Sequence, residues 1–307
     1  MRDVFIERLT ALAERDPRIM LITGDLGFGV LTKFEERFPR QYLNAGIAEQ
    51  NMTGLATGLA LEGRIVFTYS IGNFPTLRCL EQIRNDAAYH GANVNVVSVG
   101  GGFSYGALGV SHHATEDLSI MRAIPGVTVV SPGCDWEVAE AVPAIVALPG
   151  TTYLRLDKSS AGFTRRDGET FELGRARRVR DGDAATIVAT GGILGIVLSA
   201  ADQLADSGIR CRVLSMHTIK PFDANAICSA ARETGGIVTV EEHVIEGGLG
   251  SAVAEALLDN GVAPRASARL GLRGGFATVV GSQQYLRSAY QMAESDIVGA
   301  VRHVSGC

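Results

Sequence analysis

The sequence predicts an α/β protein made of two doubly wound domains, and three observations support this prediction. Short apolar runs typical of buried strands alternate with helical segments along most of the 307 residues. The chain is rich in glycine (37 residues) and poor in aromatic residues (6%), as expected of buried parallel strands joined by tight turns. A polar, arginine-rich stretch at 158–183 interrupts the alternation. We therefore expect one domain at 1–165, a linker at 166–182 and a second domain at 183–307.

The first domain is expected to begin with a helix and then to alternate strands with helices. Each expected strand is a short, mostly apolar run that ends at a turn-forming residue. The expected elements are, in order, a helix at 2–14, a strand at 18–23, a helix at 47–62, a strand at 64–69, a helix at 75–90, a strand at 94–99, a helix at 116–123, a strand at 127–132, a helix at 135–147 and a strand at 152–156. Small residues recur along 47–62, which predicts a helix packed closely on most of its sides.

The second domain is expected to repeat the same alternation. Its expected elements are, in order, a strand at 185–190, a helix at 193–206, a strand at 211–215, a helix at 223–233, a strand at 237–241, a helix at 247–259 and a helix near the end of 282–303. Strands that alternate with helices in this way predict a second parallel sheet with helices on both faces.

Composition excludes several classes of protein. The formal net charge is −5, so the chain lacks the basic field that would hold nucleic acid or an anionic membrane. No apolar run approaches the ~18–20 residues needed to span a bilayer. The charged N-terminal segment lacks the apolar core of a signal peptide. The five cysteines are scattered and form no CxxC pair: Cys79, Cys134, Cys211, Cys228 and Cys307. We therefore expect reduced thiols in a cytoplasmic protein with no zinc site.

Two segments that contain or follow glycines are candidate parts of a site: the start of the helix at Glu49 and the glycine triplet at 100–102. Glu49 stands where a loop enters the small-residue helix, so it either complements the helix dipole or is a buried carboxylate with a function. The triplet at 100–102 follows an expected strand, but its spacing fits neither a dinucleotide-binding motif nor a phosphate-binding loop. It is either a flexible turn or one wall of a substrate cleft.

A third candidate segment is 111–117, which places two histidines before two acidic residues. Further metal ligands at suitable spacing are missing, and so is the GxSxG motif of a serine hydrolase. His112 and His113 either simply precede a helix or polarise a carbonyl and move protons. Tyr69 and Phe74 flank another glycine loop, where they could form a stacking platform or fill the core.

Taken in order, these segments resemble a known family. The segments that carry the resemblance are Gly24-Asp25-Leu26, Asn44 to Asn51, Tyr69 to Phe74, Glu81 to Asp86, and Ser111 to Asp117. The chain resembles the carboxyl-terminal half of transketolase and of 1-deoxyxylulose-5-phosphate synthase. It is most similar to the separately encoded carboxyl-terminal subunit of split transketolases. The resemblance covers nearly the whole chain and implies a pyrimidine-binding domain followed by a transketolase C-terminal-like domain.

The resemblance implies chemistry that depends on thiamine diphosphate. Glu49 matches the family glutamate that hydrogen-bonds N1′ of the aminopyrimidine, which favours the imino form that removes the thiazolium proton. Phe74 matches the aromatic residue that stacks on the pyrimidine, with Tyr69 as the second choice. His112 matches an active-site histidine near the substrate, and His113 lies beside it.

The family's second cofactor motif is missing. Transketolases hold the diphosphate through Mg²⁺ bound to a Gly-Asp-Gly motif, which does not occur in these 307 residues. We therefore expect no metal ligands in this chain. The resemblance implies that an N-terminal transketolase subunit carries the motif, and that the working complex is an α2β2 assembly.

Several positions depart from the family pattern. Leu108 stands where an acidic residue is usual, Gly100 stands near the place of an additional histidine, and 27–29 replaces a family serine. Near the position of a phosphate-binding arginine we find Arg155 and Lys158. These changes predict an unusual sugar or sugar-phosphate substrate, such as a modified, deoxy or nucleotide-linked sugar.

Two other functions remain open at this stage. The chain could be the β subunit of a 2-oxo acid dehydrogenase E1 component, or an enzyme similar to 1-deoxyxylulose-5-phosphate synthase. The continuation at 115–117 after the two histidines favours transketolase over the dehydrogenase. A regulatory or scaffolding relative without activity is a third option, which the presence of Glu49 and His112 argues against.

Overall fold

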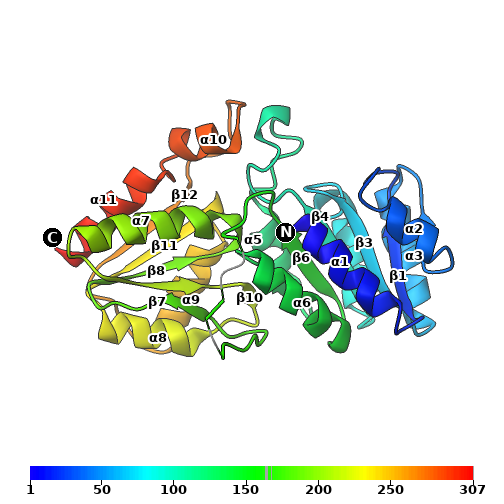
Figure 1. Cartoon of the computed structure of the whole chain (residues 1–307), viewed down its shortest axis with the longest axis horizontal. Helices are drawn as coiled ribbons and strands as arrows, with labels where there is room; N and C mark the ends of the chain where they lie inside the picture. The colour runs from blue at the N-terminus through cyan, green and yellow to red at the C-terminus, as the bar shows by residue number, and fades with distance from the viewer. Residues whose placement is uncertain (163–164, 167, 307) are drawn as a thin grey trace.

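The first of two sheets has seven strands, in the order β10-β5-β6-β4-β3-β1-β2. The computed structural model describes residues 1–162, 165–166 and 168–306 (Figure 1). The strands of this sheet are β1 (Ile19–Thr23), β2 (Tyr42–Asn44), β3 (Ile65–Ile71), β4 (Val94–Val99), β5 (Thr128–Val130), β6 (Thr152–Leu156) and β10 (Thr218–Lys220). All pair in parallel except β10, which is antiparallel to β5. The loops that follow β1, β2, β3, β4 and β6 therefore meet at one edge of the sheet.

Helices cover both faces of this sheet. The helices are α1 (Arg2–Ala13), α2 (Thr32–Arg37), α3 (Glu49–Leu61), α4 (Leu80–Gln82), α5 (Asp117–Ala123) and α6 (Asp135–Ala147), with single turns η1 (Leu77–Cys79) and η3 (Gly106–Leu108) and the π-helical segment η2 (Ile83–Ala88). Apolar side chains of α1 and α6 share one core with Phe67. Those of α3, η2 and α5 share another core with Val66. Because side chains alternate along a strand, these two cores lie on opposite faces of the sheet.

The second sheet has five strands in the order β12-β11-β8-β9-β7. Its strands are β7 (Arg177–Arg180), β8 (Ala185–Ala189), β9 (Cys211–Ser215), β11 (Ile237–Val244) and β12 (Ser267–Leu272). Its helices are η4 (Gly191–Ile193), α7 (Leu194–Asp206), α8 (Ala224–Glu233), α9 (Leu249–Asp259), α10 (Gln283–Ala289) and α11 (Glu294–Ser305). Helices α7 and α11 pack on one face, and α8 and α9 pack together on the other (Figure 1).

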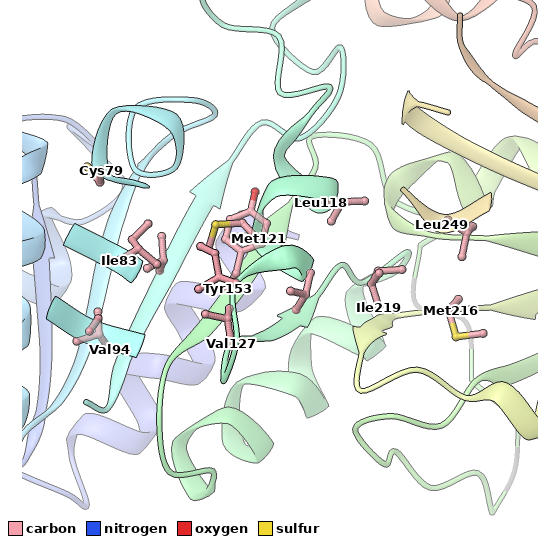
Figure 2. Close-up of a cluster of buried hydrophobic side chains, with 14 of the residues drawn as sticks. Cys79, Ile83, Val94, Leu118, Met121, Val127, Tyr153, Met216, Ile219 and Leu249 are labelled. Atoms are coloured by element: carbon pink, nitrogen blue, oxygen red, sulfur yellow. The ribbon is translucent and has the colours of Figure 1, made fainter. Parts of the chain in front are cut away.

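One apolar core continues from the first sheet to the second. Figure 2 shows Leu118 and Met121 of α5 beside Met216, Ile219 and Leu249 of the second half of the chain, and all five belong to one buried cluster. Burying this apolar surface stabilises the contact between the halves. Strand β10 adds a backbone connection, because it leaves the second half of the sequence to extend the first sheet.

The predicted fold class is confirmed, with two mostly parallel sheets between helices. The helices and strands that were not expected are α2, β2, β7, β10, β12 and α10. Strand β7 lies inside the polar stretch that was expected as a linker. This arginine-rich segment can be part of the folded domain because its arginines pair with acidic side chains; Arg177, for example, pairs with Glu137. The helix expected at 75–90 is divided into a 3-10 turn, an α-helical turn and a π-helical segment.

The expected burial of the small-residue helix is wrong for this chain. Helix α3 exposes Gly54 and Gly58, and a side chain added at either position would meet nothing within 4 Å. Beside them, Leu55 is also exposed. None of the helices in the described residues is both long and apolar enough to cross a membrane. Four of the cysteines are buried, and Cys307 lies outside the described residues.

Candidate functional site

The loop that enters α3 places Glu49 at the edge of the first sheet. Asn44 organises this loop by accepting hydrogen bonds from the backbone N–H groups of Asp25 and Gly46, both at 3.0 Å. Glu49 is the first residue of α3, and only 3% of its surface is exposed. Its Oε2 accepts a hydrogen bond from Nη1 of Arg78 at 2.6 Å. Glu49 is therefore a buried carboxylate with one charged partner.

The loop after β3 brings an aromatic ring to the same place. The guanidinium carbon of Arg78 lies 4.7 Å from the centre of the Phe74 ring. On its other side, Phe74 meets His112 edge-on, with the ring centres 5.2 Å apart. Asn73 fixes this arrangement because its Nδ2 donates to the backbone oxygen of His113 at 2.6 Å. Glu49, Arg78, Phe74 and His112 thus form one continuous row.

His112 belongs to a loop of residues 103–113 that is closed at its base. Gly102 and Ala114 exchange two backbone hydrogen bonds, of 2.8 and 3.0 Å, and so hold the loop's two ends together. The Nδ1 atom of His112 lies 3.0 Å from Oγ of Ser111. The closed loop therefore holds His112 beside Phe74.

A cation lies at the far end of this row. The ring of His112 lies 6.2 Å from that of Tyr105. The exposed Lys158 places its Nζ 3.7 Å from the centre of the same Tyr105 ring. Burial lowers the pKa of Lys158, and the nearby positive charge of Arg2 lowers it further.

The glycines at 100–102 are required by close packing. A Cβ atom at Gly100 would overlap the Tyr105 ring, and one at Gly101 would overlap the Arg155 side chain. A Cβ at Gly102 would lie 2.5 Å from Oε1 of Glu242. All three glycines thus face protein side chains, which supports a tightly packed turn at the base of the loop.

The structure places three of the expected site residues away from the row. Arg155 is 1% exposed and lies between Asp117 and Asp157, with N–O distances of 3.4 and 3.6 Å. Burial acts to lower the pKa of Arg155, but these two carboxylates outweigh it and raise the pKa above its usual value. A fully enclosed, doubly paired guanidinium has no free face for a substrate phosphate.

His113 and Tyr69 are core residues. His113 is 2% exposed, its Nε2 lies 3.1 Å from the backbone oxygen of Gly106, and its ring packs edge-on against Phe103. Tyr69 is 3% exposed and stacks on Phe5, on the face of the sheet opposite α3. Burial raises the pKa of Tyr69 well above its usual value. We therefore leave Arg155, His113 and Tyr69 out of the proposed site.

Two residues, one in the row and one next to its His112 end, were not predicted from the sequence. Arg78 follows Phe74 by four residues, which is a spacing that brings two side chains together on a helical turn. That spacing could have predicted the contact between Arg78 and Phe74. It could not have predicted the ion pair between Arg78 and Glu49, which are 29 residues apart. Tyr105 lies between Lys158 and His112 only because the loop folds back. In the part of the chain that the structure describes, no three His, Cys, Asp or Glu side chains come together as metal ligands.

Comparison with known proteins assigns both halves of the chain. Residues 1–163 match the transketolase pyrimidine-binding domain, and residues 174–297 match the transketolase C-terminal domain. The chain belongs to the transketolase family. The resemblance to split transketolases seen in the sequence is thereby confirmed.

Its relatives in the transketolase family include separately encoded subunits. A 6-deoxy-6-sulfo-D-fructose transketolase subunit of Clostridium sp. (strain MSTE9) is 38% identical over 99% of this chain and 94% of its own length. An apulose-4-phosphate transketolase subunit of Phocaeicola vulgatus is 39% identical over 86% of this chain and 85% of its own length. Among solved structures, a split-gene transketolase described as an inactive beta4 tetramer matches with a TM-score of 0.89 and 34% identity, covering 99% of this chain and 98% of its own.

Proposed function

We propose that this chain is one subunit of a thiamine diphosphate-dependent transketolase, which moves a two-carbon ketol unit between sugars. The observation that carries the proposal is the row of Glu49, Phe74 and His112 at the carboxyl edge of the first sheet, where open α/β sheets bind ligands. Membership of the transketolase family supports this function over that of a 2-oxo acid dehydrogenase subunit.

The residues present fit the pyrimidine half of the cofactor. A buried carboxylate beside a partly exposed aromatic ring offers the hydrogen-bonding group and the stacking surface that an aminopyrimidine needs. When bound, thiamine diphosphate supplies an electron sink for breaking a carbon–carbon bond next to a carbonyl. Glu49 would hold a proton at N1′ of the pyrimidine, and Phe74 would orient the ring.

His112 would act on the substrate. Its Nδ1 contacts Oγ of Ser111, so the other ring nitrogen, Nε2, is the group proposed to meet the sugar. An imidazole N–H placed near the reacting carbonyl stabilises negative charge that develops on the substrate oxygen. His112 would also be able to move a proton to or from that oxygen.

The site needs a second polypeptide. The chain has no Gly-Asp-Gly motif, so we propose that a partner subunit holds the diphosphate and Mg²⁺ in an α2β2 complex. The exposed face of α3 starts next to Glu49 and carries Gly54 and Gly58, which leaves room for another chain to approach closely. The solved relative described as an inactive beta4 tetramer supports the same requirement.

Titration of thiamine diphosphate tests the partner requirement. The purified chain should not bind the cofactor at micromolar concentration, while a mixture with its partner subunit and Mg²⁺ should bind it and turn over a ketose donor. Micromolar binding or turnover by the chain alone would overturn this part of the proposal.

The rim of the site suggests the class of substrate. Leu108 is 56% exposed and offers an apolar wall that cannot accept a hydrogen bond from a substrate hydroxyl. Lys158 offers a single point charge, which recognises an anionic group with less geometric selectivity than arginine does. Relatives are named for 6-deoxy-6-sulfo-D-fructose and for apulose-4-phosphate. We propose a modified or deoxy sugar with an anionic group, and poor use of ordinary pentose phosphates.

A comparison of kcat/KM values on the reconstituted complex tests this choice. Xylulose 5-phosphate with ribose 5-phosphate is one pair, and a panel of deoxy, sulfonated and branched sugars forms the other. We expect at least one modified sugar to exceed the pentose phosphates. A clear preference for xylulose 5-phosphate would overturn the substrate proposal and leave the transketolase assignment in place.

A further inference from the structure

We propose that Glu242, in the C-terminal domain, is a positioning residue for the loop 103–113 and through it for His112. The proposal rests on the role proposed above for His112. Glu242 lies near the end of β11 and is 2% exposed. The row of Glu49, Arg78, Phe74 and His112 comes from the first half of the chain, so the second half would act on the reaction through its contacts with this loop, of which the Glu242 contact is the charged one.

Both carboxylate oxygens of Glu242 are in use. Oε1 accepts hydrogen bonds from the backbone N–H of Phe103 and from Nε2 of Gln283, the latter at 2.8 Å. Oε2 accepts from Nε of Arg287. Arg287 in turn donates to Oγ of Ser159 at 2.9 Å. The carboxylate therefore joins Phe103, the first residue of the loop, to α10. Through Arg287 it is also connected to Ser159, which follows β6.

The loop is shaped to let this carboxylate in. Gly102 has a φ of +59° and faces Glu242 so closely that a Cβ would lie 2.5 Å from Oε1. Further along, the backbone N–H of Gly281 donates to the oxygen of Gly106 at 3.3 Å. A Cβ at Gly106 would lie 2.5 Å from the Leu286 side chain. The C-terminal domain thus contacts the loop at two places, one at Glu242 and one at Gly281 and Leu286, and only the contact at Glu242 involves a charged group.

Packing carries the position of Phe103 to His112. The Phe103 ring packs edge-on against His113, and the Nε2 of His113 lies 3.1 Å from the oxygen of Gly106. His112 directly precedes His113 in the chain, and its ring packs against Phe74. Charge-assisted hydrogen bonds are about twice as strong as neutral ones, so the Glu242 contact is the strongest restraint at the loop's start. A displacement of about 1 Å at a reacting group can cost on the order of 10²-fold in rate.

Glu241 offers a matched control on the same strand. It is also fully buried, and adjacent side chains of a strand point to opposite faces. Its carboxylate accepts from the backbone N–H groups of Leu249 and Gly250, at 2.6 and 2.8 Å, at the start of α9. The hydrogen bonds of Glu241 thus go to α9 and do not include the loop 103–113.

The first measurement is amide hydrogen exchange on the full chain, which does not depend on activity. Glu242→Gln should speed exchange in residues 103–113 by at least ~10-fold, since loops held by fewer hydrogen bonds open more often. Glu241→Gln should leave those amides unchanged. Gln283→Leu removes one donor to Oε1 without stranding a charge, and it should give a smaller change of the same kind. Unchanged exchange in both Glu242→Gln and Gln283→Leu would overturn the proposal.

The second measurement is kinetic and uses the complex with its partner subunit. Glu242→Gln should lower kcat by ~10- to 100-fold, while the Kd for thiamine diphosphate stays within twofold. In a His112→Ala background, Glu242→Gln should have no further effect on kcat. An equal loss in both backgrounds would show a general structural role and overturn the proposal. If His112→Ala itself keeps full activity, the proposed function of His112 fails, and the exchange measurement still decides whether Glu242 positions the loop.

Discussion

Two glutamate–arginine pairs occupy contrasting places in this protein. In the pair Glu49–Arg78 the arginine side chain is 45% exposed, whereas in the pair Glu242–Arg287 it is 7% exposed. Glu49 has one charged partner, and Glu242 is held by an arginine, an amide side chain and a backbone N–H. The same two residue types therefore form part of an accessible site in the pair Glu49–Arg78 and a buried contact between domains in the pair Glu242–Arg287.

Exposure explains the different uses of the two pairs. In the first pair the Arg78 side chain is 45% exposed, so water can solvate it when a ligand takes its place beside the buried Glu49. Breaking a buried pair strands a charge and typically costs ~3–5 kcal/mol, so such a pair stays closed and fixes what it touches. The following predictions test this contrast, from the largest expected effect to the smallest.

Glu49→Gln should lower kcat of the reconstituted complex by on the order of 10²–10⁴, because an amide cannot supply the acid–base assistance of a carboxyl group. The measurement is steady-state turnover at saturating cofactor. Thermal stability should change little, and the same substitution at the exposed Glu36 of α2, Glu36→Gln, should keep normal activity. If Glu49→Gln keeps more than half of the activity, Glu49 only stabilises the start of α3.

Arg155→Met should lower the free energy of unfolding by ~3–5 kcal/mol, because it leaves the buried Asp117 and Asp157 without their shared cation. Urea denaturation followed by circular dichroism measures this change. The exposed Lys158→Met is the control and should change stability by less than ~0.5 kcal/mol. A small effect of Arg155→Met would mean that Asp117 and Asp157 do not depend on Arg155.

The buried neighbours Glu241 and His243 should give opposite pH dependences of stability. Burial raises the pKa of Glu241 to about 7, so its contribution falls as pH rises from its unfolded pKa toward 7. Burial lowers the pKa of His243 to about 4, against an opposing effect of Asp117, so its contribution falls as pH drops from 6.5 toward 4. Between about pH 4.5 and 6.5 the contributions of these two groups oppose each other, so their sum should vary little with pH.

Glu241→Gln should reveal the contribution of His243 to the pH dependence of stability. Between about pH 4.5 and 7 its free energy of unfolding should rise by roughly 3 kcal/mol more than that of the wild type, since the opposing contribution of Glu241 is gone and each pKa unit corresponds to ~1.4 kcal/mol. Denaturant titrations at a series of pH values measure this slope. His243→Asn should give the reverse slope over the same range. Equal slopes for wild type and both variants would contradict the assignment of these two groups.

Arg78→Leu should have the smallest effect. The guanidinium occupies Oε2 of Glu49 and covers the Phe74 ring, which are the two groups proposed to receive the pyrimidine. Removing it frees both groups and should lower the Kd for thiamine diphosphate by up to ~5-fold, which corresponds to about 1 kcal/mol. Calorimetric titration of the complex measures this, with the exposed Arg84→Leu as the control. Weaker binding would show that Arg78 is itself a contact for the cofactor.

The sequence by itself determined the fold class and the kinds of residue in the site. Apolar runs and turn residues predict local structure, and this is why the strand Val94–Val99 and the helix Asp135–Ala147 were expected at the bounds observed. Strands β2 and β10 were missed because each has three residues and only one aliphatic side chain, whereas β5, which is equally short, lies in an apolar run that begins at Val127. Glu49, Phe74 and His112 were proposed as site residues from the resemblance of their segments to transketolases.

Only the tertiary structure decided which polar residues are accessible. Arg155 and Lys158 stand three residues apart and were expected to share a role, yet one is enclosed between two carboxylates and the other is exposed. The partners of Glu49 and Glu242 lie 29 and 45 residues away along the chain. Burial and pairing depend on where distant segments meet, and that depends on the packing of the two sheets, which no local pattern encodes.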